Sequence, residues 1–131
     1  MKIDDILDLG LAGGSTLDDV LAFAGLVGAH AHMSRRKFGS DQKVGPIGSV
    51  KHLGLEVLEV LKDPDDPIEY VDIVFLVADA VRRYLAQSGL SISEFVALGR
   101  EKLAVIEARN YPSPLDGEPR EHIKNETERG L

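Results

Sequence analysis

Apolar residues recur at helical spacing in four stretches of the chain, and residues that start or stop helices bound each stretch. In the first, either Ser15 or Thr16 can act as the N-cap, and Asp18 and Asp19 would favour the positive end of the helix dipole. The apolar stripe consists of Leu17, Val20, Leu21, Phe23, Ala24 and Val27. We expect this helix to reach about residue 36, and a glycine-rich loop to follow over residues 38–49.

The second and third apolar stretches are joined by a short segment that contains two prolines. The second helix is expected to run from about Ser49 to Lys62, because Pro64 disfavours helical geometry at the residue before it. The third has Asp66 as its N-cap, a proline at its first position, and Gly89 as its end. Three β-branched residues in this stretch also fit a buried strand, but its length and its cap favour a helix. The short connection predicts that these two helices run antiparallel.

The fourth helix begins at Ser91, where Glu94 would complete a capping box, and ends near Asn110 because Pro112 blocks its continuation. Residues 113–131 are polar, and we expect them to form a C-terminal arm beside a single helical domain of residues 1–112. Four helices with short connections predict an all-α fold, similar to a four-helix bundle.

Composition narrows the classes of protein that fit this pattern. The absence of cysteine excludes disulfides and cysteine-rich zinc sites. A net charge of −7 argues against a surface that binds duplex nucleic acid, which needs clustered Lys and Arg. The sequence has no apolar run long enough to cross a membrane, and Asp4, Asp5 and Asp8 interrupt the stretch where a signal peptide would need apolar residues. We therefore expect a cytoplasmic protein with no membrane partner.

Acidic side chains lie on one face of each of the two middle helices. His52, Glu56 and Glu59 share a face of the second helix, and Glu69, Asp72 and Asp79 share a face of the third. Their neighbours are mostly apolar, and a buried carboxylate must find a cation, hydrogen-bond donors or a metal ion. If the helices are antiparallel, the carboxylates can converge on Mg²⁺, which prefers oxygen ligands. The alternative is that both faces are simply solvated and that Glu69 is only a capping residue.

The order of these motifs resembles the MazG-like all-α nucleoside triphosphate pyrophosphohydrolases, which carry ExxE on one helix and ExxD on the next. The resemblance is greatest to the phage and bacterial dATP/dGTP diphosphohydrolases of the MazZ type. It rests on Phe38-Gly39, on the segments 52–56, 69–72 and 107–112, on Lys102, and on the tripeptide 121–123. The chain departs from the family pattern at Ile106, where Asn is frequent, and at Tyr70 and Tyr111, where Trp is frequent.

The resemblance implies hydrolysis of a nucleoside triphosphate, with dATP or dGTP as the expected substrate, to the monophosphate and pyrophosphate. It implies Mg²⁺, with Mn²⁺ as a substitute, on Glu56, Glu59, Glu69 and Asp72, and assigns catalysis to Glu56 and Glu59. It also implies a homodimer or homotetramer, located in the bacterial host cytoplasm if a phage encodes the protein. The rival hypothesis is a non-catalytic helical interaction module or a nucleotide-binding regulator.

Several other residues are candidates for contact with the substrate. Lys102 and Arg109 share a helix face and would contact phosphate oxygens, although a solvated basic face is an equal alternative. A locally basic segment contributes Lys37 with Phe38 and Gly39. His52 would contact substrate or bond to a carboxylate, or else have a purely structural role. We exclude His30 and His32 as a metal-binding pair, because residues two apart point to opposite sides of a helix.

Overall fold

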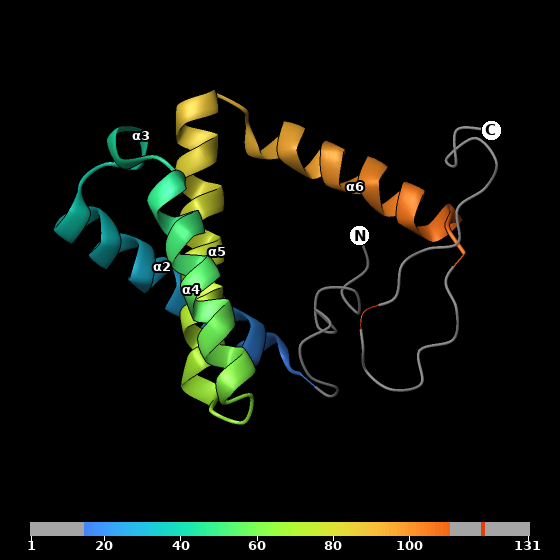
Figure 1. Ribbon diagram of the computed structural model, residues 1–131. Coiled ribbons are helices and arrows are strands. Elements are labelled where there is room, and N and C mark those ends of the chain that lie inside the picture. The colour runs from blue at the N-terminus through green and yellow to red at the C-terminus, as the bar shows by residue number, and fades with distance from the viewer. Residues whose placement is uncertain (1–14, 111–118, 120–131) are drawn as a thin grey trace. The chain divides into compact units, whose positions relative to one another are not determined.

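The computed structural model describes residues 15–110 and residue 119. Figure 1 shows the five helices of this part of the chain: α2 (Leu17–Phe38), α3 (Asp41–Val44), α4 (Ile47–Lys62), α5 (Pro67–Ser88) and α6 (Ile92–Ala108). The all-α prediction is confirmed, and the four long helices match the four predicted stretches to within about two residues at each end. The predicted C-terminal arm lies outside the described residues, apart from Pro119.

The predicted caps account for where α2, α5 and α6 begin, whereas α4 begins after Pro46 without a side-chain cap. Thr16, not Ser15, caps α2: its hydroxyl accepts from the backbone N–H of Asp19, whose carboxylate accepts from the backbone N–H of Thr16 at 2.9 Å. Asp66 caps α5 by accepting from the N–H of Ile68 at 3.0 Å. α5 ends where Gly89 adopts a left-handed conformation with φ of 73°, which glycine adopts at little cost.

The predicted loop between the first two long helices is wrong in one respect, because it contains the short helix α3. Ser40 caps this helix, with its hydroxyl accepting from the N–H of Lys43 at 3.4 Å. Gly39 and Gly45 flank it with positive φ angles of 110° and 70°. The glycines that indicated a loop therefore serve as the turns on both sides of a single helical turn, which is too short to show an apolar period.

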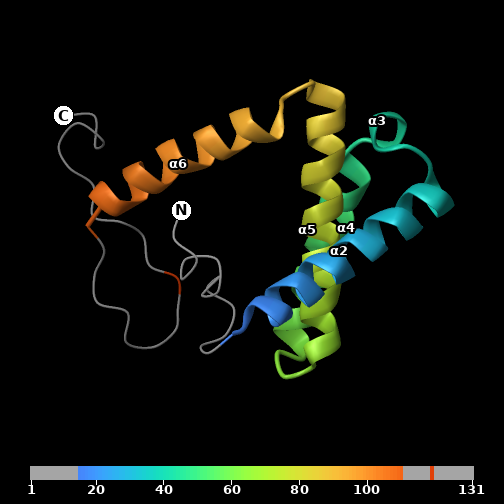
Figure 2. The same ribbon diagram turned by 180° about the vertical axis from the view of Figure 1, so that it is seen from behind.

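The chain divides into two compact units, residues 1–89 and residues 90–131. In the first unit α4 and α5 lie side by side and run in opposite directions, as the short connection predicts, and α2 crosses α5 (Figures 1 and 2). α3 lies against α5 as well. The second unit contains α6, with Ser91 and Glu94 forming the predicted capping box.

The best-buried side chains of the first unit are polar and form a network between helices. Asp79 and Arg83 of α5 are 4% and 5% exposed. Arg83 donates to the hydroxyls of Ser34 in α2 and Ser49 in α4, both at 2.6 Å, and Ser34 donates to Asp79 at 3.1 Å. Arg82 donates to Asp79 at 2.7 Å. The prediction that buried Asp79 needs a cation or hydrogen-bond donors is confirmed, because Arg82 supplies a positive charge and both Arg82 and Ser34 donate to its carboxylate.

A second part of the network fixes α3. Asp41 accepts from the Nε atoms of Arg35 and Arg82, both at 2.9 Å. Burial would raise the pKa of Asp41, but the hydrogen bonds and charges of the two arginines outweigh it and hold this pKa below its usual value. Gln87 donates to the backbone oxygen of Gln42 at 2.8 Å. These contacts attach the α2–α4 connection to the C-terminal half of α5.

Apolar burial within the chain is small by comparison. Among the described residues, Ala31 is the only buried hydrophobic residue, whereas large apolar side chains of every long helix are exposed. On α4 these include Leu55 and Leu61, which are 63% and 73% exposed. None of the described helices is sufficiently long and apolar to span a membrane.

Candidate functional site

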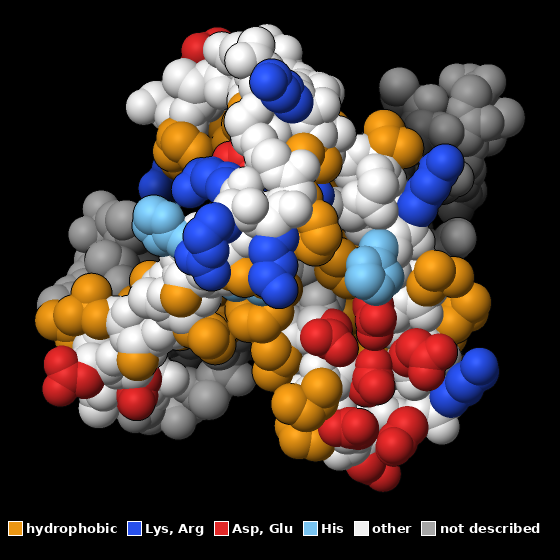
Figure 3. Space-filling model, turned by 90° about the vertical axis from the view of Figure 1, so that its left-hand side faces the viewer, with side chains coloured by type: hydrophobic (Ala, Val, Ile, Leu, Met, Phe, Trp, Pro, Cys, Tyr) orange, Lys and Arg blue, Asp and Glu red, His pale blue; other side chains and the backbone are white. Residues whose placement is uncertain are grey.

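Three carboxylates from two helices meet in the first unit. Glu56 of α4 and Glu69 and Asp72 of α5 each place an oxygen within 4.8 Å of the others, and all three side chains are half-buried. The antiparallel arrangement brings them together, since α5 begins beside the end of α4 and returns along it. Figure 3 shows acidic side chains gathered toward the end of the molecule where these two helices are connected, beside a histidine.

The cluster is electrostatically unfavourable by itself. Partial desolvation raises the pKa of Glu69, and so do hydrogen bonding to Glu56 and the negative charges of Glu56, Asp66 and Asp72. One oxygen of Glu69, Oε2, is buried and has no hydrogen-bond partner among the described residues. A buried acceptor without a donor, surrounded by other carboxylates, is the environment that a cation would satisfy.

The donor set fits a hard divalent cation. Mg²⁺ binds through one or two carboxylates together with water and substrate phosphates, and does not need an all-protein cage. Glu56, Glu69 and Asp72 supply such oxygens, on rigid helices rather than on loops. Glu59 is exposed and is not part of this group of three. Its predicted role as a metal ligand and as a catalytic residue stays a prediction.

His52 lies next to the cluster and contacts one of its members. Its Nε2 atom is 3.3 Å from Oε1 of Glu56, one helical turn away on α4, while its side chain remains 60% exposed. The structure therefore supports the prediction that His52 contacts a carboxylate. Contact with substrate stays a prediction.

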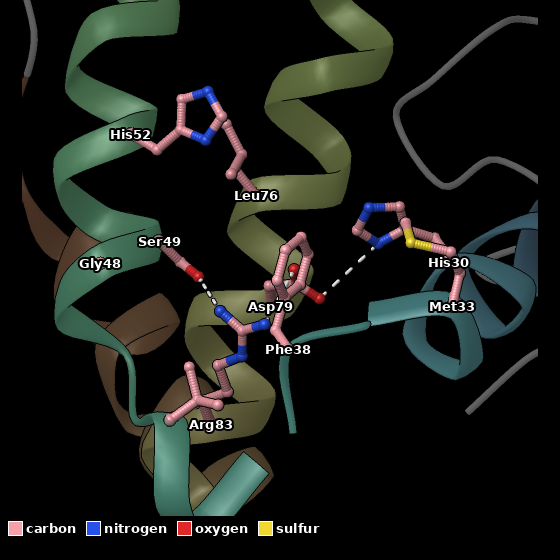
Figure 4. Close-up of a pocket in the computed structure, with 10 residues that line it drawn as sticks. His30, Met33, Phe38, Gly48, Ser49, His52, Leu76, Asp79 and Arg83 are labelled. Carbon is pink, nitrogen blue, oxygen red and sulfur yellow. Dashed lines mark hydrogen bonds and ion pairs between the residues drawn. The ribbon is translucent and has the colours of Figure 1, made fainter. Parts of the chain in front are cut away.

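Two neighbouring cavities lie in this unit, and the smaller of them reaches the carboxylates. The smaller, of about 300 Å³, is lined by Glu56 and Asp72 together with His30, His52, Phe75 and Leu76. The larger, of about 450 Å³, lies between α2, α4 and α5 and shares His30, His52 and Leu76 with the smaller one (Figure 4). The shared residues place the two cavities next to each other, with the acidic cluster at one end.

His30 is a site residue that sequence reasoning missed. Its ring stacks on Phe75, with centroids 4.1 Å apart and planes inclined by 9°, and its Nδ1 lies 3.6 Å from Oδ1 of Asp79. His32 is exposed. It lies two residues along the helix from His30, and this spacing places it on the opposite side of α2. Its place in the site, for His30, depends on the packing of α2 against α5. No local sequence pattern specifies that packing, so the sequence held no signal for this residue.

The predicted substrate-binding residues fall into two groups. Lys37 and Phe38 end α2 and are exposed, Phe38 lines the larger cavity, and Gly39 follows as the C-cap. Lys102 and Arg109 are in the second unit, Lys102 within α6 and Arg109 as its C-cap, so their contact with phosphate stays a prediction. Nε of Arg109 is buried without a hydrogen-bond partner among the described residues.

Comparison with known proteins identifies the family. Residues 26–129 match the family described as dATP/dGTP pyrophosphohydrolase. The Eaa protein of Salmonella phage P22 is 46% identical over 100 residues, which are 76% of this chain and 29% of that protein. The chain thus corresponds to less than a third of the length of this relative. No solved structure matches the chain. Because the family match spans most of its length, the chain belongs to the dATP/dGTP pyrophosphohydrolase family.

Proposed function

We propose that this protein hydrolyses dATP and dGTP to the monophosphate and pyrophosphate in a magnesium-dependent reaction. The observation that carries the proposal is the group of three carboxylates from α4 and α5, whose oxygens lie within 4.8 Å of one another, in a chain of this family. The adjoining cavities supply room for a substrate next to those carboxylates.

In this proposal Glu56, Glu69 and Asp72 hold the metal, with Glu59 as a further ligand one helical turn from Glu56. Mg²⁺, or Mn²⁺ in its place, supplies charge neutralisation for the triphosphate and a bound water of lowered pKa. Glu56 and Glu59 are the carboxylates assigned to orienting or deprotonating the attacking water. His52 orients Glu56 through their 3.3 Å contact.

Cationic and glycine residues would hold the rest of the substrate. Lys37 with Phe38 and Gly39 lies at the end of α2, and Lys102 and Arg109 supply ammonium and guanidinium donors, respectively, for phosphate oxygens. The family and its phage relative favour a role in the nucleotide pool of a bacterial cytoplasm.

Incubation of the purified chain with each nucleoside triphosphate, with and without Mg²⁺, tests the proposal. We expect dATP and dGTP to yield monophosphate and pyrophosphate in equal amounts, and we expect chelation with EDTA to stop the reaction. Release of inorganic phosphate from the intact triphosphate would contradict the proposed bond cleavage. Tight binding of dATP or dGTP without turnover would favour the nucleotide-binding regulator instead.

We also propose that the active form is a homodimer or homotetramer. Exposed apolar side chains on α4 and α5, among them Leu55, Leu58, Leu61 and Ile68, support this proposal, because such surfaces are normally covered in a stable protein. Sedimentation equilibrium at micromolar concentration is expected to give two or four times the mass of one chain. A single-chain mass under conditions where the protein is active would contradict it.

A further inference from the structure

We infer that His30 is a phosphate-binding residue, whose imidazole takes up a proton when the nucleotide binds and then donates from Nε2 to a phosphate oxygen. The inference rests on the proposed function, since it assigns a further contact to the same substrate. His30 lines the cavity of about 300 Å³ together with Glu56 and Asp72. A triphosphate held at those carboxylates therefore meets this imidazole in the wall of the same cavity.

Two contacts fix the ring of His30. One face stacks on Phe75, with ring centroids 4.1 Å apart, and the side chain is 17% exposed. At one edge, Nδ1 is buried without a hydrogen-bond partner among the described residues and lies 3.6 Å from Oδ1 of Asp79. Asp79 in turn accepts from Arg82 and Ser34, so the carboxylate beside the ring is itself held in place. The imidazole thus has its orientation before a ligand arrives.

The carboxylate of Asp79 decides which nitrogen of the ring is available to a ligand. An ionised carboxylate accepts hydrogen bonds and does not donate them, so it favours the tautomer with hydrogen on Nδ1. Nε2 then carries the lone pair that gains a proton when the imidazole becomes charged. In Figure 4 the dashed line to Asp79 starts from one ring nitrogen, and the other nitrogen points away from Asp79. The nitrogen that gains the proton is therefore turned away from the buried network.

The other charged groups near His30 already have partners or can only accept. The titratable and charged groups around it are His52 and Glu56 of α4, and Asp72, Asp79, Arg82 and Arg83 of α5. The carboxylates are acceptors when ionised, and the two arginines pair with Asp79 at 2.7 Å and 3.6 Å. Nε2 of His52 lies 3.3 Å from Glu56. The imidazole of His52 is therefore engaged, and that of His30 remains to bind phosphate.

A phosphate oxygen matches Nε2 of His30 in charge and in hydrogen bonding. Phosphate offers acceptors only, and its negative charge stabilises an imidazole in the protonated form. Binding is therefore linked to protonation, so the nucleotide binds more tightly as the pH falls. The added affinity is lost as the pH rises and the ring becomes neutral, because Nε2 then presents a lone pair to the phosphate oxygen.

Calorimetry with the α,β-imido analogue of dATP measures affinity and proton uptake together. Saturating Mg²⁺ is added first, so that protons released from the carboxylates by the metal are not counted. Titrations at one pH, in buffers that differ in their enthalpy of ionisation, give the number of protons taken up for each analogue bound. At about pH 7–8, where a free imidazole is largely neutral, we expect the wild type to take up protons on binding.

His30→Gln is the test variant, because glutamine keeps a polar side chain but does not titrate. We expect it to bind the analogue at least about tenfold more weakly, as for the loss of a hydrogen bond to a charged group, and to take up no proton. His32→Gln is the matched control, since it is the same substitution at an exposed position of the same helix. It should keep both the affinity and the proton uptake of the wild type.

Proton uptake that persists in His30→Gln would show that another group receives the proton, and would overturn the inference. Unchanged affinity of His30→Gln, equal losses in both variants, or no binding by the wild type would overturn it as well. Proton uptake by the wild type is required in every case. Its absence overturns the inference even if His30→Gln fails to fold.

These outcomes are separate from those of the proposed function, because the analogue has nitrogen in place of the bridging oxygen and cannot release pyrophosphate. If binding depends on His30 but dATP is not hydrolysed, the phosphate contact stands and the proposed reaction fails. If dATP yields the monophosphate and pyrophosphate while His30→Gln binds the analogue as the wild type does, the reaction stands and the phosphate contact fails.

Discussion

Asp72→Asn is expected to lower kcat/KM for magnesium-dependent pyrophosphate release at least about 100-fold, while the helices stay folded. The amide removes one of three negative oxygen donors that lie within 4.8 Å of one another, so the cation is held less tightly and in a different position. The loss of one charge also relieves repulsion with Glu56 and Glu69. We therefore expect the unfolding temperature without Mg²⁺ to be equal to that of the wild type or higher.

Two measurements distinguish a metal site from a solvated acidic face. Addition of Mg²⁺ should raise the unfolding temperature of the wild type, because the ion binds only the folded state, and should raise that of Asp72→Asn much less. Asp65→Asn, the same substitution at an exposed position in the α4–α5 connection, is the control and should behave as the wild type. Full activity of Asp72→Asn would contradict the proposed metal site.

Asp79→Ala is expected to destabilise the fold by about 3–5 kcal/mol, a large part of the 5–15 kcal/mol that typical domains have. Its removal leaves the guanidinium of Arg83, 5% exposed, without the carboxylate that lies 3.6 Å away. It also removes the acceptor that Ser34 and Arg82 share across α2 and α5. Urea unfolding, followed by circular dichroism at fixed protein concentration, measures the loss.

Glu101→Ala is the control for this effect, because Glu101 is an exposed carboxylate in the middle of α6. Its replacement should change the free energy of unfolding by no more than about 0.5 kcal/mol, as for other surface substitutions. If the two variants unfolded at the same urea concentration, the buried network would not be what holds α2 to α5.

The helices were predictable because their signals are local. Thr16, Asp66, Ser91 and Gly89 act within one turn of their own positions, so each cap can be recognised without knowledge of the rest of the fold. The exception is α3, where Ser40 caps a helix of four residues between two glycines. One turn carries no apolar periodicity, and the same glycines indicate a loop equally well.

The site was predictable only in part. The spacing of Glu56, Glu69 and Asp72 indicated two acidic faces, and the short α4–α5 connection indicated that they would meet. The same spacing placed Glu59 on the face of Glu56, yet Glu59 is exposed and outside the group. Residues on one helix face can still point to different sides of a helix pair, and only the packing angle decides which of them reaches the partner.

The sequence by itself determined the all-α class, the limits of the long helices and the acidic pairs, since all of these follow from residue types at fixed local spacing. Only the tertiary structure decided that Ser34, Ser49 and Arg83, from three helices, would join Asp79 in one buried network. It also decided that His30 would lie beside the carboxylates. These contacts join residues as many as 49 positions apart, and how such segments meet depends on the crossing of α2 over α5, which no local pattern encodes.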